Sequence, residues 1–408
     1  MAEKVCLSQT KQALLNLLAN NLFGAGSAVV DENVDWRTLW LESYLQTVSL
    51  LVFSNYTPSR CTQEDLSKIR SKLNNTLTQS LAVQKEHAKL HRILTSAGIE
   101  YVILKGYAAA HYYKDPLLRS MGDVDFLVRE KDVEKAEEIL LLNGYVSAEK
   151  SHGYHRVYVG ECRLEMHTEP AGIPQSPMGQ TVRGLLRDII DSRVLVNTMF
   201  GEMYLPSQFH HGLVLLLHTA HHLTNEGVGL RHLCDWAVFA GSFGNSDFEN
   251  IFSQKLKSVG LWDFAKILTK TSVIYLGCPQ KEWAQDADVK LCDTLILDII
   301  KSGNLGQKNV DRSHEGLLVS ADGKNKGIGY IIKYFNNIVY SNWKFAKKWK
   351  IFLPFGWVYF TLRYIFRSVK GERPEIRPKN IITEANSRNA FFNELKLFRV
   401  SQAYSNQP

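Results

Sequence analysis

Two aspartates separated by a single residue are the feature of this sequence best suited to chemistry. Asp123 and Asp125 follow Gly122 and precede the apolar run Phe126–Val128. An apolar segment of this kind, with Val124 between the acids, predicts a β-strand. Side chains two residues apart on a strand point to the same face, so the two carboxylates would lie together and repel each other. We therefore expect a cation, and Mg²⁺ suits one or two carboxylates combined with substrate phosphates. The alternatives are a solvated turn and a structural Ca²⁺ site.

A glycine turn upstream of the aspartates is suited to phosphate binding. The apolar run Tyr101–Leu104 is typical of a strand, Lys105 and Gly106 end it, and a helix-forming run begins at Ala108. A strand, a glycine turn and a helix N-terminus together offer backbone N–H groups and a positive dipole end to an anion. We therefore expect Lys105 and Gly106 to hold a phosphate group.

Three further residues extend the predicted site. Polar and apolar residues alternate in Arg163–His167, which places Glu165 and His167 on one face of a strand. Glu165 could add a third carboxylate or face water, and His167 could contact the substrate or support a metal ligand. Arg119 precedes the aspartates, where it could clamp a phosphate or form a surface ion pair.

The combined motifs resemble those of the DNA-polymerase-β-like nucleotidyltransferase superfamily. More narrowly, they resemble a poorly characterised bacterial nucleotidyltransferase family within it, over about residues 85–245. The matching residues are Leu104–Gly106, Asp115–Pro116, Arg119, Gly122–Asp125 and Glu165–His167, and 217–236 resembles the helical part of that family. The resemblance implies an α+β fold, with a mixed polymerase-β-like sheet between a helical N-terminal module and an α-helical C-terminal domain.

The resemblance also implies a reaction, the transfer of a nucleoside monophosphate from an NTP to an acceptor hydroxyl. Asp123, Asp125 and Glu165 would be catalytic and would hold two Mg²⁺ ions. The nucleotide would be bound by Lys105, Gly106, Arg119 and Gly122. The acceptor is left open among a sugar, a small molecule, a protein side chain and an RNA end.

One departure from the superfamily pattern supports an alternative function. The superfamily usually has Gly-Gly or Gly-Ser at the turn, whereas this chain has Gly106 followed by Tyr107. The alternative is a catalytically degenerate binding module, acting in a toxin–antitoxin system or in polysaccharide assembly at a membrane surface.

Composition limits the class of protein. The chain has 408 residues, 45% hydrophobic and 22% charged, with a net charge of +7, which suits a globular protein of several domains. Its six cysteines form no CxxC pair, so reduced and mostly buried thiols are expected. No apolar run reaches the length of about 20 residues that a spanning helix needs, and the N-terminus lacks the apolar core of a signal peptide. These features predict a cytoplasmic protein.

Helical periodicity and turn residues divide the chain into predicted units. The core at 98–171 contains the strands named above, a helix at 131–143 and strands near 145 and 154–159. Residues 172–185 are predicted to be a loop, and helices are predicted at 206–223, 229–242, 246–258, 261–277 and 283–301. The full division is a helical module at 1–97, the catalytic core at 98–171, a helical domain at 172–302, a flexible loop at 303–328, a basic aromatic helical tail at 329–373 and a polar extension at 374–408.

Two other clusters of side chains have alternative interpretations. In 343–373, aromatic residues alternate with lysine and arginine, which suits inward-packed helices, a peripheral contact with the inner face of a membrane or, less well, nucleic acid. His218 and His222 share a helical face, but the segment lacks the glutamate of the HExxH zinc motif. We expect them, with His221, to be packed core or interdomain residues. Arg231 and Asp235 suit a simple helical ion pair.

Overall fold

The computed structural model describes residues 7–27, 29–149, 155–308, 332, 335–336, 339–340, 342–369 and 378–400. Most of the loop predicted at 303–328, and parts of the predicted tail and extension, lie outside these residues. Of the six cysteines, five are described, and all five are free thiols, with Cys61 half-buried and the other four buried.

A mixed five-stranded sheet forms the centre of the fold and confirms the predicted α+β class. Its strands lie in the order β1-β2-β5-β4-β3, with β2 parallel to β5 and every other neighbouring pair antiparallel. The strands are β1 (Tyr101–Ile103), β2 (Asp123–Val128), β3 (Val146–Glu149), β4 (His155–Val159) and β5 (Arg163–His167). Parallel pairing sets Asp125 opposite Glu165.

Alternation along β2 gives the sheet two different faces. Val124 and Phe126 pack into a buried cluster with Leu90 and Leu94 of α4 (Gln63–Ser96) and with α6 (Val133–Leu142). The aspartates of β2 therefore point to the opposite face, because neighbouring residues of a strand alternate between faces. Thr62 caps the N-terminus of the long helix α4, since its hydroxyl accepts a hydrogen bond from the Asp65 N–H at 3.1 Å.

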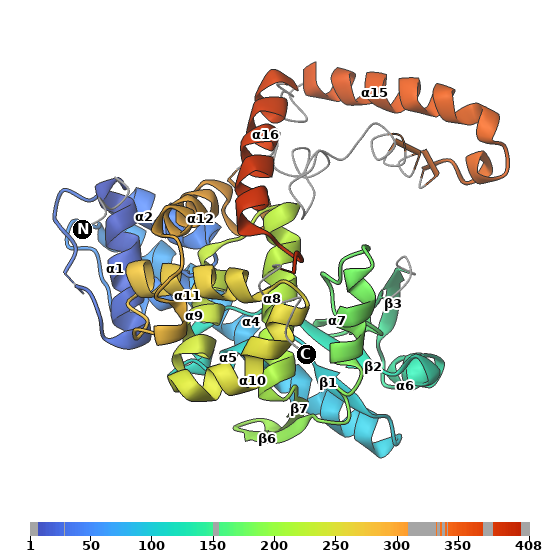
Figure 1. The fold of residues 1–408 in the computed structure, drawn as a ribbon, viewed down its shortest axis with the longest axis horizontal. Helices are drawn as coiled ribbons and strands as arrows, with labels where there is room; N and C mark the ends of the chain where they lie inside the picture. The colour runs from blue at the N-terminus through green and yellow to red at the C-terminus, as the bar shows by residue number, and fades with distance from the viewer. Residues whose placement is uncertain are drawn as a thin grey trace.

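One hydrophobic core joins the N-terminal helices to those that follow the sheet (Figure 1). Gln46, fully buried, ties the two sets together, since its amide nitrogen donates to the Ile299 carbonyl at 3.2 Å and its amide oxygen accepts from the Leu230 N–H at 2.8 Å. The helices are α1 (Gln9–Phe23), α2 (Trp36–Leu45), α3 (Ser49–Phe53), α8 (Gln208–Thr224), α9 (Leu230–Gly241), α10 (Asn245–Ser258), α11 (Trp262–Leu276) and α12 (Val289–Ser302).

The prediction of a loop at 172–185 is wrong for its second half, where the helix α7 (Met178–Leu186) forms. Gly179, Val182 and Leu186 are buried on one side of this helix, and the proline and glycine content of the segment concealed that periodicity. The hairpin of β6 (Val194–Thr198) and β7 (Gly201–Leu205) was not predicted, because its turn lacks an Asn-Gly or Asp-Gly signature.

The C-terminal part of the described chain is helical. Short 3₁₀ turns at Lys344–Lys347 and Lys350–Phe352 lead into α15 (Leu353–Val369), and α16 (Pro378–Leu395) follows. Figure 1 shows α15 set apart from the helical body, at the top of the view. Within the described residues, no helix has both the length and the apolar content to cross a membrane.

Candidate active site

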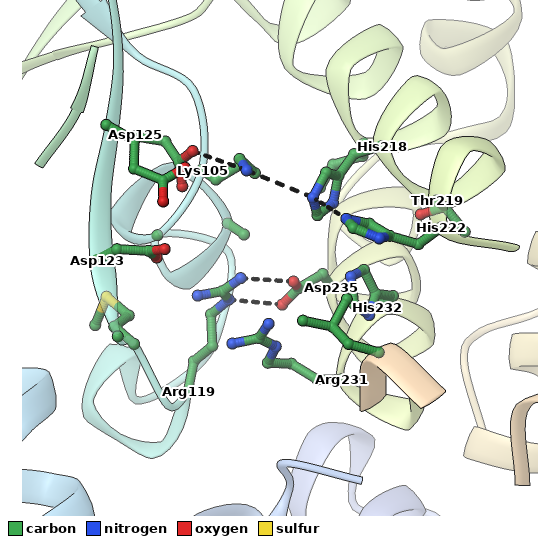
Figure 2. A pocket seen from close by; sticks show the side chains of 17 residues that line it. Lys105, Arg119, Asp123, Asp125, His218, Thr219, His222, Arg231, His232 and Asp235 are labelled. Carbon is green, nitrogen blue, oxygen red and sulfur yellow. Dashed lines mark hydrogen bonds and ion pairs between the residues drawn. The ribbon is translucent and has the colours of Figure 1, made fainter. Parts of the chain in front are cut away.

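A cavity of about 250 Å³ lies between the acidic face of the sheet and helices α8 and α9. Figure 2 shows Asp123 and Asp125 on one side and His218, His222 and Asp235 on the other. The remaining lining residues are Lys105, Gly106, Ala109, Arg119, Met121, Gly122, Glu165, Leu215, Thr219, Arg231, His232 and Leu305. Seven of the eight residues predicted for the site therefore share one cavity, and His167 lies behind Asp125.

Asp125 is the most strongly bound of the acids. Its Oδ1 accepts a hydrogen bond from Lys105 Nζ at 2.8 Å and another from His167 Nε2 at 3.0 Å. Burial alone would raise the pKa of Asp125, but the Lys105 ammonium and His167 outweigh burial and hold the pKa below its usual value. Asp125 is therefore ionised at neutral pH and in a fixed orientation.

Asp123 is in the opposite electrostatic situation. Burial and the neighbouring Asp125 carboxylate raise the pKa of Asp123 above its ordinary value. Repulsion between the two carboxylates is the largest unfavourable charge interaction of this acid. A divalent cation bound by both side chains would relieve this repulsion.

Glu165 lies beside Asp125 across the parallel β2–β5 pair. Its Oε1 accepts from Arg163 Nε at 2.8 Å, and its Oε2 lies 3.2 Å from His155 Nε2. Three carboxylates on one face of the sheet form the hard oxygen donor set that Mg²⁺ binds, so the residues present fit that ion. Glu165 and His167 share a strand face as predicted.

The turn between β1 and the next helix depends on Gly106. Its backbone conformation, with φ of 65° and ψ of −110°, is accessible to glycine but strained for residues with a Cβ. Helix α5 (Tyr107–Ala110) has only four residues, so it lacks most of the dipole expected at this turn. The Tyr107 side chain is buried in the sheet core and does not line the cavity, so it leaves the pocket open.

Replacing Gly106 with alanine is expected to lower the free energy of unfolding by about 2 kcal/mol, because the backbone conformation is strained for any residue with a Cβ. The added carbon would also lie 3.3 Å from the His87 ring. Urea denaturation measures the change. Gly184→Ala is the control, since Gly184 is helical with open space around its Cβ position, and equal effects of the two substitutions would contradict the strain argument.

His87, buried behind this turn, is expected to make stability depend on pH. Burial lowers the pKa of His87 to about 4, whereas the unfolded chain protonates histidine near about 6.5. Between these values the unfolded state binds the extra proton. The free energy of unfolding therefore falls as the pH falls, by about 3 kcal/mol for this residue. Denaturation of the wild type and of His87→Asn between pH 7 and pH 4 tests this, and parallel curves for the two proteins would exclude the effect.

Arg119 was predicted to bind phosphate or to form a surface ion pair, and its ion pair is instead buried. Its Nε and a terminal nitrogen donate to the two carboxylate oxygens of Asp235, each at 2.8 Å. The Tyr113 hydroxyl also donates to Asp235, at 2.7 Å. Because Asp235 pairs with Arg119, the predicted helical ion pair of Arg231 with Asp235 is wrong. Arg119 joins α9 to the segment before β2.

Arg231 lines the same cavity and differs from Arg119 in its partners. One terminal nitrogen donates to the Ser120 carbonyl at 3.3 Å, and its Nε is buried without a hydrogen-bond partner. Among the described residues no carboxylate forms an ion pair with Arg231. Burial and the charge of Arg119 lower the pKa of Arg231. A half-buried cation without an ion-pair partner, facing a cavity, is suited to an anionic ligand.

Three imidazoles form the wall opposite the aspartates. His218 Nε2 lies 2.9 Å from His222 Nε2 and 3.5 Å from Lys105 Nζ, and the His232 ring stacks on His218 at 5.2 Å between centroids. Burial lowers the pKa of His218 and His232 well below the ordinary value, so both are neutral. Sequence reasoning found the helical spacing of His218 and His222 but missed His232, which lies on α9.

The sheet, its paired aspartates and the facing helices define a site of the nucleotidyltransferase class. The chain belongs to the family described as uncharacterised nucleotidyltransferases, whose family model matches residues 32–277. This match confirms the family suggested by the sequence motifs. No curated protein and no solved structure matches the chain.

Proposed function

We propose that this protein transfers a nucleoside monophosphate from an NTP to a hydroxyl acceptor in a Mg²⁺-dependent reaction. The observation that carries the proposal is the meeting of Asp123, Asp125 and Glu165 with the cations Lys105 and Arg231 around one cavity. Carboxylates suited to Mg²⁺ beside cations suited to phosphate are the parts that phosphoryl-group transfer requires.

Each side chain has a role in this proposal. Asp123 and Asp125 would hold two Mg²⁺ ions, with Glu165 completing one of them. When bound, these ions would supply charge stabilisation for both the entering and the leaving oxygen. Lys105 lies between Asp125 and His218 and would turn toward the triphosphate. Arg231 would take the role that was predicted for Arg119, and Gly106 and Gly122 would let the backbone approach the phosphates.

The proposed transfer needs no reactant besides the NTP and the acceptor hydroxyl. The acceptor oxygen bonds to the α-phosphorus, the bond to the bridging oxygen breaks, and pyrophosphate leaves. Glu165 would accept the hydroxyl proton. His167 would hold Asp125 in place through the 3.0 Å hydrogen bond to its Oδ1.

Transfer can be tested without knowing the acceptor class. The full chain is incubated with each of the four NTPs, labelled at the α-phosphate, together with Mg²⁺ and representative sugars, small alcohols, proteins and RNA. The proposal expects label on one acceptor class and equimolar pyrophosphate, both absent with Asp125→Asn. Equal labelling by the wild type and Asp125→Asn would overturn the assigned site.

One observation favours a second candidate, a nucleotide-binding module without turnover. Lys105 already neutralises Asp125 at 2.8 Å, so this carboxylate is satisfied without a metal. In that case NTP binding would be insensitive to EDTA, and Lys105→Met would weaken binding more than Asp125→Asn does. Transfer to any acceptor would exclude this candidate.

A further inference from the structure

The three imidazoles opposite the aspartates have the arrangement of metal ligands. One ring nitrogen from each of His218, His222 and His232 lies within 4.8 Å of the other two. Figure 2 shows His218 and His222 on one helix, with His232 beside them on the next. Because the three residues come from α8 and α9, the packing of these two helices fixes the cluster.

The hydrogen-bonding state of two of these histidines suits metal binding. His222 Nδ1 lies 3.1 Å from Glu226 Oε2. A carboxylate accepts hydrogen bonds, so Nδ1 carries the proton and the lone pair of Nε2 faces His218. A carboxylate on the outer nitrogen is the usual support of a metal-binding histidine. His232 Nδ1 is buried without a hydrogen-bond partner, which is uncommon for a buried polar atom and leaves it available to a ligand.

We propose that His218, His222 and His232 bind a late first-row divalent metal ion of the Zn²⁺ type, at a site separate from the carboxylates. Three imidazole nitrogens suit zinc, whereas Mg²⁺ selects oxygen donors. All three histidines line the cavity, so water or a ligand oxygen would take the fourth position. The two sides of the cavity would therefore select different metals.

Lys105 is the group that opposes this ion. Its Nζ lies 3.5 Å from His218 Nε2, where a bound cation would repel it. Asp125, at 2.8 Å from the same Nζ, offers Lys105 a partner on the other side. Metal binding would shift Lys105 fully toward the acidic side, where the proposed function requires a cation for the triphosphate.

Metal binding by the full chain tests this proposal independently of activity. The protein is stripped with EDTA, freed of chelator and titrated with Zn²⁺ against a chromophoric competitor. We expect one Zn²⁺ per chain with micromolar or tighter affinity and no competition from millimolar Mg²⁺. His222→Asn and His232→Asn should each weaken binding at least tenfold, and Glu226→Gln by about 10- to 100-fold.

Controls separate this site from its neighbours. His221→Asn, next to the cluster on α8, should keep wild-type zinc affinity. Circular dichroism checks that each variant is folded. The absence of stoichiometric zinc would overturn the proposal. So would zinc binding that survives His232→Asn but is lost in His155→Asn, because His155, Glu165 and His167 form the other candidate cluster among the described residues.

A separate observation concerns the apolar side of α15, which is exposed. Phe355 is 66% exposed, Leu362 60% and Phe366 59%. With Val358 and Tyr359, also exposed, they follow the three- and four-residue spacing of one helical face. Phe345 and Trp349, just before this helix, are exposed as well. Inward packing is therefore contradicted for these exposed residues, whereas Trp343, Trp357 and Phe360 of the same segment are half-buried.

We infer that this exposed side lies on a membrane surface rich in anionic lipid. Exposed Lys348, Lys350 and Arg363 accompany the apolar face, and basic residues beside exposed aromatic ones are typical of helices that lie in the bilayer interface. With 17 residues, α15 is not among the helices long and apolar enough to span a bilayer, since none of the described residues forms one. It would lie parallel to the surface.

Vesicle flotation tests this inference. The full chain should float with vesicles of phosphatidylglycerol and phosphatidylcholine, and much less with phosphatidylcholine alone. Phe355→Ser combined with Leu362→Ser should reduce flotation at least tenfold, whereas Leu142→Ser, at an exposed apolar residue on α6, should not. Equal flotation of all variants would contradict the inference. Binding to RNA instead of vesicles, with steep salt dependence, would assign the surface to nucleic acid.

Discussion

Replacing Asp125 with asparagine is expected to reduce monophosphate transfer by about a thousandfold. Asp125 is one of the acids that would hold the Mg²⁺ ions. Metal ions contribute several kcal/mol to stabilising such transition states, and each 1.36 kcal/mol is worth about tenfold in rate. Asparagine keeps the shape of the side chain but removes its charge. Steady-state transfer kinetics at saturating Mg²⁺ measure the loss.

Two controls make this result specific. Glu134→Gln, at an exposed acid on α6, removes the same charge far from the cavity and should retain wild-type activity. Urea denaturation of Asp125→Asn should show a cooperative transition, which separates lost chemistry from lost fold. A folded Asp125→Asn protein with near wild-type kcat/KM would show that the reaction takes place elsewhere.

Replacing Asp235 with leucine is expected to lower the free energy of unfolding by about 3–5 kcal/mol, the usual effect of leaving one partner of a buried ion pair alone. Asp235 is 4% exposed and Arg119 6%. The substitution would leave the Arg119 guanidinium and the Tyr113 hydroxyl without their acceptor. The urea midpoint and slope measure the change.

The double variant Arg119→Met with Asp235→Leu should recover most of this stability, because an apolar pair of similar size often replaces a buried ion pair without loss. Recovery would show that the cost comes from the unpaired charge. A single Asp235→Leu change within about 1 kcal/mol of wild type would contradict a structural role for the pair, given the usual cost of an unpaired buried charge.

Local pattern was enough to predict the part of the site that lies on the sheet. The alternation around Asp123 and Asp125 fixes which face they occupy, and the same rule places Glu165 with His167. These inferences need only the two-residue period of a strand. Parallel pairing of β2 with β5, which brings Glu165 beside Asp125, was not predicted, because the periodicity of one strand does not indicate its neighbour.

The other wall of the cavity could not be predicted, because its contacts join distant parts of the chain. Arg119 and Asp235 are 116 residues apart, and no local spacing indicates that they meet. His232 lies on a different helix from His218, so the i,i+4 pair of α8 gave only two of the three imidazoles. Arg231 looked like a partner for Asp235 because helical neighbours were the only contacts that sequence could supply.

Isothermal titration with the four NTPs, in Mg²⁺ and in EDTA, tests the central claim most directly. The account predicts that at least one NTP binds the wild type in Mg²⁺, that EDTA abolishes this binding, and that Asp123→Asn and Asp125→Asn abolish it while Glu134→Gln does not. Binding that persists in EDTA or in both aspartate variants, or no binding of any NTP, would contradict a metal-dependent nucleotide site on this sheet.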